Sequence, residues 1–181
     1  ARRRDLRTHL DGARLLNAQV ASGRSAAELV EGIDSTSICL SKGLGAPVGS
    51  VLAGNRAFIE SARRWRKRLG GGMRQVGILA AAGLYALEHH VARLAQDHEN
   101  AKLLAEGFAA QEGVELVASP ETNIVIVEIG ASTSTILERC AAEGLLLCPF
   151  GAGRLRAVTH LDVDTADCQR AVEIFARALA A

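Results

Sequence analysis

The sequence contains no apolar run of the roughly 18 residues that a membrane-spanning helix needs. Its longest candidate, residues 76–87, contains glycine and leads into Glu88 and two histidines. A net charge of one sign is also absent, because 21 Lys and Arg residues face 20 Asp and Glu residues. We therefore predict no membrane span, and no overall charge that would attract nucleic acid or an anionic membrane.

The cysteines lack the spacing of a metal site, since no C-x-x-C pair occurs. They stand in apolar or helical surroundings, so we expect four reduced, buried, small side chains and no bound metal. Reduced thiols favour a cytoplasmic location, with a mitochondrial one as the alternative. The cysteines are Cys39, Cys140, Cys148 and Cys168.

An initiating methionine and a secretion signal are missing ahead of Ala1. The composition, 49% hydrophobic and 23% charged, is typical of a globular protein rather than a disordered one. A chain of this length can bury roughly 70% of its unfolded surface. We expect a folded chain that is part of a longer protein.

Basic residues gather at two places in the sequence. We interpret Arg2–Arg4, together with Arg7, as part of a solvated helix face. The second cluster, residues 63–68, is followed closely by Gly70–Gly72. Because glycines follow them, these basic residues are stronger candidates for contacting a phosphate group than those of the first cluster.

Short apolar segments separated by glycine predict alternating strands and helices in the first half. We expect a strand that ends near Asp11 and is followed by a helix. Two further strands are expected at residues 34–40 and 48–53, the second one apolar on both faces and covered by helices on each side. A helix over residues 56–68 is ended by the three glycines.

From Arg74 as far as Leu104, apolar residues recur at helical spacing. We expect a long helix, bent or broken near residues 95–97, that joins two domains. Residues 1–90 and 91–181 are the expected domains, and the second is a compact αβ unit. Its predicted elements are strands at 114–117, 123–129, 145–149 and 155–159 and helices at 133–143 and 165–179, the last capped by Asp164 or Thr165.

The chemistry of the first half centres on Lys42, which follows a strand and precedes a Gly-Leu-Gly turn. Glycine lets a backbone pack closely against a flat ring, and a partly desolvated lysine amine can react with an aldehyde. Asp11 ends another strand, and a carboxylate there can keep a pyridine nitrogen protonated. Most lysines in glycine-rich turns are simply solvated, so the surrounding sequence decides the interpretation.

Four segments resemble segments of one known family in the same order: HLDGAR (9–14), DSTSICLSKGLGAPVGS (34–50), RWRKRLGGGMRQ (64–75) and RAVTHLDV (156–163). The family is that of the low-specificity threonine aldolases, and the chain resembles their C-terminal half. The resemblance implies the α/β, aspartate-aminotransferase-like fold of pyridoxal-phosphate-dependent enzymes, with a partial large domain followed by a small C-terminal αβ domain. It also implies the cofactor pyridoxal 5'-phosphate and cleavage of L-threonine or L-allo-threonine to glycine and acetaldehyde.

The resemblance also implies roles for single residues. Lys42 would carry the cofactor, Asp11 would pair with its ring nitrogen, and Arg14 would reach the ring oxygen and the substrate carboxylate side. Arg156 would bind the substrate α-carboxylate with its guanidinium fork, or else be a solvated arginine at a strand edge. Arg74 would contact the cofactor phosphate of a neighbouring subunit, or else only begin a helix. The implied whole enzyme is a homo-oligomer, either a dimer or a tetramer.

No histidine is a strong candidate for the base that takes the proton of the substrate β-hydroxyl. We expect His89, His90 and His98 on the long helix, in surface or core packing roles. His9 and His160 lie next to strands, where packing or hydrogen bonding is expected. The base is therefore left unassigned.

Three interpretations of the function remain open. The chain is part of a working threonine aldolase, or a truncated and catalytically inactive relative with a structural or interaction role. A third interpretation is a different pyridoxal-phosphate reaction such as β-elimination, because a fold does not fix its chemistry. The close agreement around DGAR and SKGLGAPVGS makes the third interpretation the weaker choice, and of the other two we favour the first.

Overall fold

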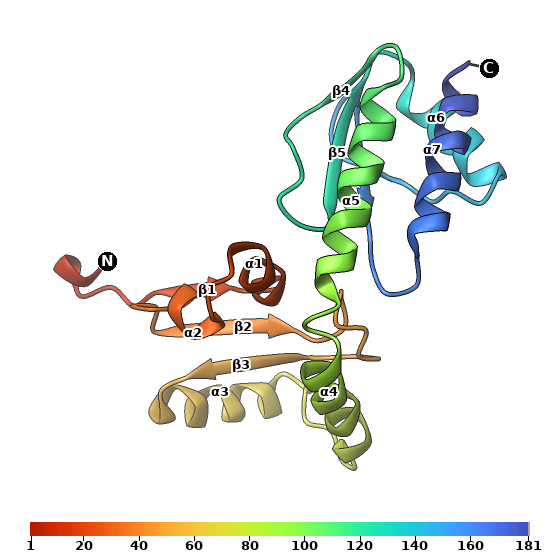
Figure 1. Ribbon diagram of the computed structural model, residues 1–181. Coiled ribbons are helices and arrows are strands. Elements are labelled where there is room, and N and C mark those ends of the chain that lie inside the picture. Colours follow the sequence, from red (N-terminus) through yellow and green to blue (C-terminus); the bar gives the residue numbers. More distant parts are fainter. Residues whose placement is uncertain (181) are drawn as a thin grey trace. The chain divides into compact units, whose positions relative to one another are not determined.

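The computed structural model describes residues 1–180 and shows an α/β chain. It divides into two compact units, Ala1–Ala92 and Arg93–Ala181 (Figure 1). Each unit has its own β-sheet and its own helices. The predicted residues Asp11, Arg14 and Lys42 all belong to the first unit.

The first unit is built on a three-stranded sheet in the order β1-β2-β3. β1 pairs with β2 in parallel, whereas β2 and β3 are antiparallel. The carboxyl ends of β1 and β2 therefore meet at one edge of the sheet. The elements of this unit are a 3-10 turn at Arg2–Arg4, β1 (His9–Asp11), α1 (Leu15–Ser22), α2 (Ala26–Leu29), β2 (Ser35–Cys39), β3 (Ser50–Gly54), α3 (Arg56–Arg68) and α4 (Gly77–His89).

A polar clamp holds the beginning of β1 against the beginning of β2. The carboxylate of Asp34 accepts hydrogen bonds from the backbone N–H of Thr8 (2.7 Å) and from its hydroxyl (3.0 Å). The backbone bond from Thr8, followed by the hydroxyl bond and one from Arg7, lowers the pKa of Asp34. The clamp aligns the two strands, so that Asp11 lies opposite Ser37.

The sequence interpretation missed α2, although its signal is present. Ser25 caps the helix by accepting a hydrogen bond from the backbone N–H of Glu28, whose carboxylate reaches back to the N–H of Ser25. This reciprocal pattern is the capping box that a Ser-x-x-Glu sequence predicts. The preceding helix α1 ends at Gly23, which has a positive φ of 69° that suits glycine.

The expectation for β3 was wrong in two respects. The strand spans Ser50–Gly54 rather than residues 48–53, and all five of its residues are exposed. β3 is an edge strand, and of the helices of this unit it packs mainly with α3. Its apolar residues Val51 and Leu52 are therefore open to solvent within the described part of the chain.

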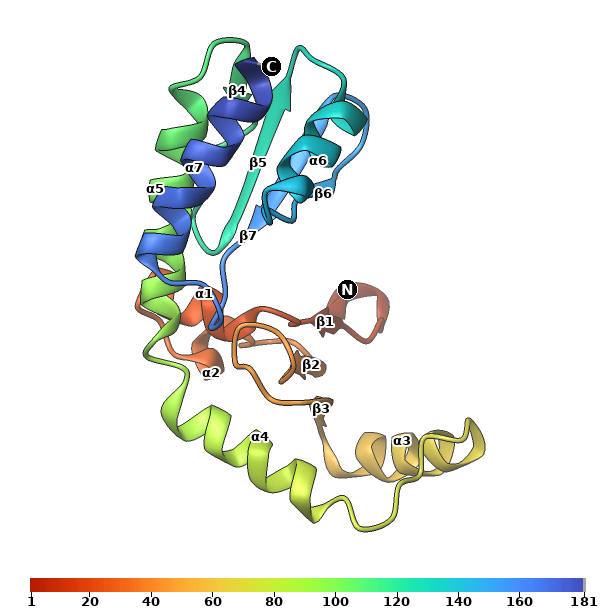
Figure 2. The same cartoon turned by 90° about the vertical axis from the view of Figure 1, so that its right-hand side faces the viewer.

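The second unit is an antiparallel sheet in the order β4-β5-β7-β6 with three helices packed against it. Helices α5 and α7 pack side by side, and α6 packs on α7 (Figure 2). These two layers enclose one hydrophobic core, as a small αβ unit requires. The elements are α5 (Leu94–Ala109), β4 (Val114–Leu116), β5 (Ile124–Ile129), α6 (Thr133–Ala142), β6 (Cys148–Pro149), β7 (Arg154–Val158) and α7 (Thr165–Ala180).

The core of the second unit follows from the alternation along β5. Val125, Val127 and Ile129 are buried, while Glu128 between them is exposed. A buried aliphatic side chain stabilises the fold by about 1.5–3 kcal/mol relative to an exposed one. The rings of Phe108 in α5 and Phe175 in α7, with centroids 4.3 Å apart, join the two helices in this core.

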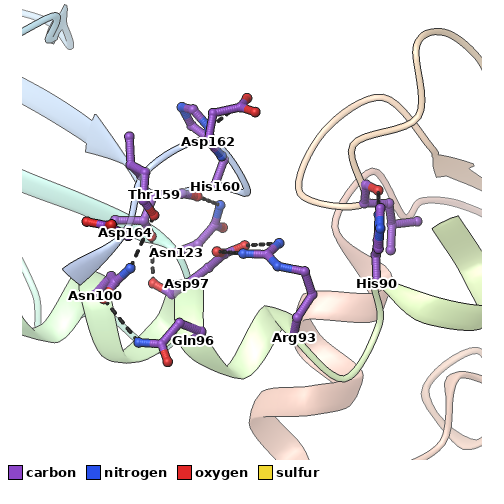
Figure 3. Close-up of polar contacts among 12 residues, drawn as sticks. His90, Arg93, Gln96, Asp97, Asn100, Asn123, Thr159, His160, Asp162 and Asp164 are labelled. Carbon is purple, nitrogen blue, oxygen red and sulfur yellow. Dashed lines mark hydrogen bonds and ion pairs between the residues drawn. The ribbon is translucent and has the colours of Figure 1, made fainter. Parts of the chain in front are cut away.

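The long helix predicted from Arg74 onward breaks earlier than expected. α4 ends at His89 and α5 begins at Leu94, so the break lies ahead of residues 95–97. Asp97, at the end of the expected break, is a fully buried acid in the first turn of α5, paired with Arg93 (Figure 3). A negative charge there is favoured by the helix dipole.

The Asp97 turn is also the centre of a buried polar network (Figure 3). The Thr159 hydroxyl donates to the carbonyl of Asp97 at 2.6 Å, and the Asn123 side-chain amide donates to the carbonyl of Thr159 at 2.8 Å. Buried polar groups require such partners. The network therefore joins α5 to the ends of β5 and β7.

The contact between α5 and α7 yields a test at Gly107. A Cβ at this position would lie 2.7 Å from Cγ1 of Val172 and closer still to its Cγ2, so Gly107→Ala overpacks the helix pair. Alanine gains about 1 kcal/mol in helix propensity, but overpacking costs about 1–3 kcal/mol, so we expect a net loss of stability of roughly 1 kcal/mol. Thermal unfolding followed by circular dichroism measures it.

Val172→Ala added to Gly107→Ala provides the matched control. Removing the two methyl groups clears the space, so the double variant should be more stable than the sum of the single changes predicts. Additive single effects would show that the two residues do not clash.

Candidate functional site

The candidate site lies at the edge of the first sheet where the parallel strands β1 and β2 both end. In open α/β sheets, ligands bind outside the carboxyl ends of such strands. Asp11 is the last residue of β1, and Lys42 follows the end of β2 by three residues. Both side chains are exposed at this edge.

Lys42 stands at the first position of a tight turn. The backbone N–H of Gly45 donates to the carbonyl of Lys42 at 2.8 Å, and that of Ala46 donates to the carbonyl of Leu40 at 3.0 Å. Gly45 has a φ of 71°, a conformation that glycine adopts without strain. Leu40, Leu44 and Ala46 are buried, so the turn is anchored while the lysine faces solvent.

Gly12 explains how the end of β1 approaches β2. A Cβ on this buried residue would lie 2.7 Å from the carbonyl oxygen of Ser37, so no larger residue fits. The next residues turn away, because a carboxylate oxygen of Asp11 accepts a hydrogen bond of 3.2 Å from the backbone N–H of Ala13. Asp11 is thereby held at the sheet edge.

Arg14 and Lys42 line the same small hollow, of about 10 Å³, together with Cys39 and Asn17. Arg14 is half-buried and immediately precedes α1. Arg14 and Lys42, far apart in the sequence, therefore border one hollow. Asp11 lies at the same sheet edge but outside the lining of this hollow.

Cys39 adds a polarised thiol to the hollow. Burial alone would raise its pKa, but hydrogen bonds from Ser41 and Ser50 and the positive charge of Lys42 together lower the pKa below its usual value. Its sulfur lies 3.5 Å from the hydroxyl of Ser41.

The two remaining predicted residues lie elsewhere. Arg74 is exposed in the connection between α3 and α4 and does not line the hollow with Lys42. Arg156 is a half-buried residue of β7 in the second unit, with its guanidinium carbon 5.6 Å from the centre of the Phe150 ring. Its buried Nε has no hydrogen-bond partner within residues 1–180.

The histidines mostly have the local roles expected of them. Nδ1 of His9 and the hydroxyl of Ser35 form a hydrogen bond of 2.9 Å, and Nδ1 of His160 accepts one of 3.3 Å from the backbone of Asp162. His98 is buried, and this burial lowers its pKa. His90 differs, because its ring contacts the Lys42 turn.

A hollow of about 600 Å³ in the second unit was not anticipated from the sequence. It lies between α7, the end of β7 and the segment 143–147, and its lining includes Phe108, His160 and Ile174. None of the five predicted site residues lines it. In the part of the chain that the structure describes, no helix is long and apolar enough to cross a membrane, and no three potential ligands gather as a metal site would need.

The geometry of the sheet edge alone does not identify a protein family, whereas comparison with known proteins does. The family model described as beta-eliminating lyase matches residues 1–132. The chain belongs to this family. The predicted resemblance to threonine aldolases is confirmed as well, because the curated relatives carry that name.

Low-specificity L-threonine aldolase 1 of Arabidopsis thaliana is 42% identical over 99% of this chain and 51% of its own length. Low specificity L-threonine aldolase of Escherichia coli (strain K12) is 50% identical over 90% of this chain and 48% of its own length. The chain thus spans about half the length of the curated relatives it matches.

A solved structure from Exiguobacterium sp. 255-15 has the same fold. It is described as an aromatic amino acid beta-eliminating lyase/threonine aldolase, and it superposes with a TM-score of 0.81 at 30% identity, covering 98% of this chain and 54% of that one. The expected α/β fold of pyridoxal-phosphate-dependent transferases is therefore confirmed.

The prediction that all four cysteines are buried was wrong for two of them. Cys140 and Cys168 are buried, but Cys148 is exposed because it lies on the two-residue edge strand β6, and Cys39 is only half-buried. Burial, reinforced by Asp167, Asp164 and Asp97, raises the pKa of Cys168 to about 11.

Thiol reactivity tests this difference. At pH 8 we expect Cys39 and Cys148 to react with a thiol reagent within minutes, because they are accessible, while Cys140 and Cys168 react only on unfolding. Mass spectrometry of digested samples, with and without denaturant, identifies the labelled residues. Rapid labelling of Cys168 in the folded chain would contradict its burial.

Proposed function

We propose that this chain forms about half of a pyridoxal-phosphate-dependent aldolase that cleaves L-threonine and L-allo-threonine to glycine and acetaldehyde. The observation that carries the proposal is that Lys42, which lines a hollow with Arg14, follows β2 at the same sheet edge where Asp11 ends β1. Family membership and the names of the relatives support it. The substrate specificity rests on those relatives alone.

The residues at this edge fit the cofactor in chemical type. The exposed amine of Lys42 can bond covalently to an aldehyde, the carboxylate of Asp11 can hold a proton on a pyridine nitrogen, and Arg14 can donate to a ring oxygen. Pyridoxal phosphate, when bound, supplies an electron sink for the pair of electrons released when a carbon–carbon bond breaks. Asp11 matters most for this role, because it keeps the ring nitrogen protonated.

Arg156 is the proposed clamp for the substrate carboxylate. Its buried Nε lacks a partner in residues 1–180, and buried polar groups of this kind are rarely left unpaired. A carboxylate with two oxygens in one plane suits the guanidinium fork. Arg74, exposed beyond α3, is proposed to contact the cofactor phosphate in a neighbouring subunit.

The domain roles, assembly and compartment follow as parts of the same proposal. Residues 1–90 would be the C-terminal part of the cofactor-binding domain, and residues 91–181 the small domain. A homo-oligomer, dimer or tetramer, is supported by large exposed apolar residues of the first unit, which mark interaction surfaces. Four free cysteines support a cytoplasmic location. The exposed residues include Trp65, Leu69, Met73, Ile78 and Leu84.

Covalent capture of the cofactor tests the role of Lys42. After incubation with pyridoxal phosphate and reduction with borohydride, peptide mass spectrometry should find the adduct on Lys42, one of only three lysines in the chain. Lys42→Ala should abolish this adduct. Lys42→Arg should do so too, because a guanidinium stays charged and cannot replace the amine.

The control is Lys67→Ala, which removes an exposed lysine of α3. It should leave the adduct on Lys42 unchanged. An adduct that persists in Lys42→Ala, or that lies mainly on Lys67 or Lys102, would overturn the assignment of the cofactor lysine.

A hybrid enzyme tests Asp11. When this chain replaces the matching part of the Escherichia coli aldolase, Asp11→Asn should leave cofactor attachment in place but lower kcat by at least about a hundredfold, equivalent to roughly 2.7 kcal/mol. The neutral amide cannot hold the ring nitrogen protonated, so the electron sink weakens. Acetaldehyde formation from L-threonine measures the rate.

Asp5→Asn, which alters an exposed aspartate ahead of β1, is the matched control and should retain full activity. Unchanged kcat in Asp11→Asn would remove Asp11 from the mechanism. A folded hybrid that takes up the cofactor but shows no activity with either substrate would favour the catalytically inactive relative.

A further inference from the structure

The turn that carries Lys42 is attached to helix α4 at two points, although α4 is about 40 residues away in the sequence. Leu40, just before the turn, packs on Gly83 so closely that a Cβ there would lie 3.0 Å from its Cδ1. Leu44, inside the turn, receives a hydrogen bond from His90, the residue that caps α4. α4 therefore supports the turn from behind.

The hydrogen bond from His90 is short and has a defined direction. Nδ1 of His90 lies 2.6 Å from the carbonyl oxygen of Leu44, shown as the dashed line at His90 in Figure 3. A carbonyl can only accept, so Nδ1 must carry the proton and donate it. The ring is half-buried, and Tyr85 packs edge-on against it with centroids 5.4 Å apart.

The accepting carbonyl of Leu44 belongs to the peptide group whose N–H closes the turn. Leu44 is 4% exposed, and its peptide group stands between the two backbone bonds that close the turn, from Gly45 to Lys42 and from Ala46 to Leu40. Fixing the Leu44 carbonyl fixes the peptide that joins Leu44 to Gly45. That same peptide group donates its N–H to the carbonyl of Lys42, so the His90 bond restrains the turn at Lys42.

We propose that His90 is a positioning residue that holds the Lys42 turn ready to bind pyridoxal phosphate. It does not touch the cofactor but acts through the backbone of Leu44, and the proposal rests on the proposed function of Lys42. His89, its neighbour, is exposed, and its ring packs on Tyr85 at 4.3 Å and lies beside Glu88. The two adjacent histidines thus have different roles.

Three variants of the chain test the proposal: His90→Leu, His90→Asn and His89→Leu. Leucine removes the donor while keeping an apolar body, and asparagine places an N–H close to the position of Nδ1. His89→Leu is the matched control, because it makes the same change one residue away. Two measurements are made: amide hydrogen exchange of residues 43–46, and the rate at which pyridoxal phosphate becomes attached to Lys42, trapped with borohydride.

In His90→Leu we expect the amides of Gly45 and Ala46 to exchange at least about tenfold faster, because the turn opens more often. Cofactor attachment should slow by a similar factor, since an amine in several conformations is seldom in reacting position. His90→Asn should restore both values to within about twofold of the unsubstituted chain. His89→Leu should change neither.

Unchanged exchange in His90→Leu would overturn the proposal, and so would faster exchange spread evenly over residues 1–92, which would indicate general destabilisation. If His90→Leu does not fold, His90→Asn decides: values like those of the unsubstituted chain support the donor role, and values unlike them refute it. If the unsubstituted chain attaches no cofactor at Lys42, the proposed function fails, while hydrogen exchange still judges the link between His90 and the turn.

Discussion

The parallel pairing of β1 with β2 is the constraint on which the candidate site depends. Two parallel strands end at the same edge of a sheet, so residues 31 positions apart in the sequence, Asp11 and Lys42, come to the same edge. The Asp34 clamp aligns the strands at one end, and Gly12 lets them approach at the other. The strand pairing alone therefore brings a carboxylate and a lysine to one edge of the sheet.

Much of this fold could be predicted because local patterns determine it. The alternation of β5 and the cap of α7, where the backbone N–H of Asp167 donates to Asp164, follow from neighbouring residues. The position of the break was predicted near residues 95–97 but lies between His89 and Leu94, because Asp97 is inside the first turn of α5, where it pairs with Arg93. The exposure of β3 also escaped prediction, because an apolar strand reveals its composition but not what covers it.

In the candidate site, too, features set by neighbouring residues could be predicted, whereas contacts between distant residues could not. Lys42 and Asp11 could be proposed from the sequence because each stands beside its own strand end and a glycine. The link from His90 to Leu44 could not, since it joins residues 46 positions apart and a histidine on a helix usually packs or faces solvent. Arg156 could be proposed only by resemblance, and its Nε, unpaired within the described residues, is a structural reason to expect a ligand.

A lysine that must react at one position needs support from the backbone around it. The lysine side chain has a flexible four-carbon stem and a strongly hydrated charge, so its amine samples many positions unless the attachment point is fixed. Correct placement of reacting groups lowers a barrier by removing that freedom beforehand. In this chain the contacts that restrain the turn are made by Leu40, which packs on Gly83 of α4, and by Leu44, which is bonded to His90, rather than by the exposed lysine itself. Lys42 is therefore exposed to solvent, while Leu40 and Leu44 on either side of it are held against α4.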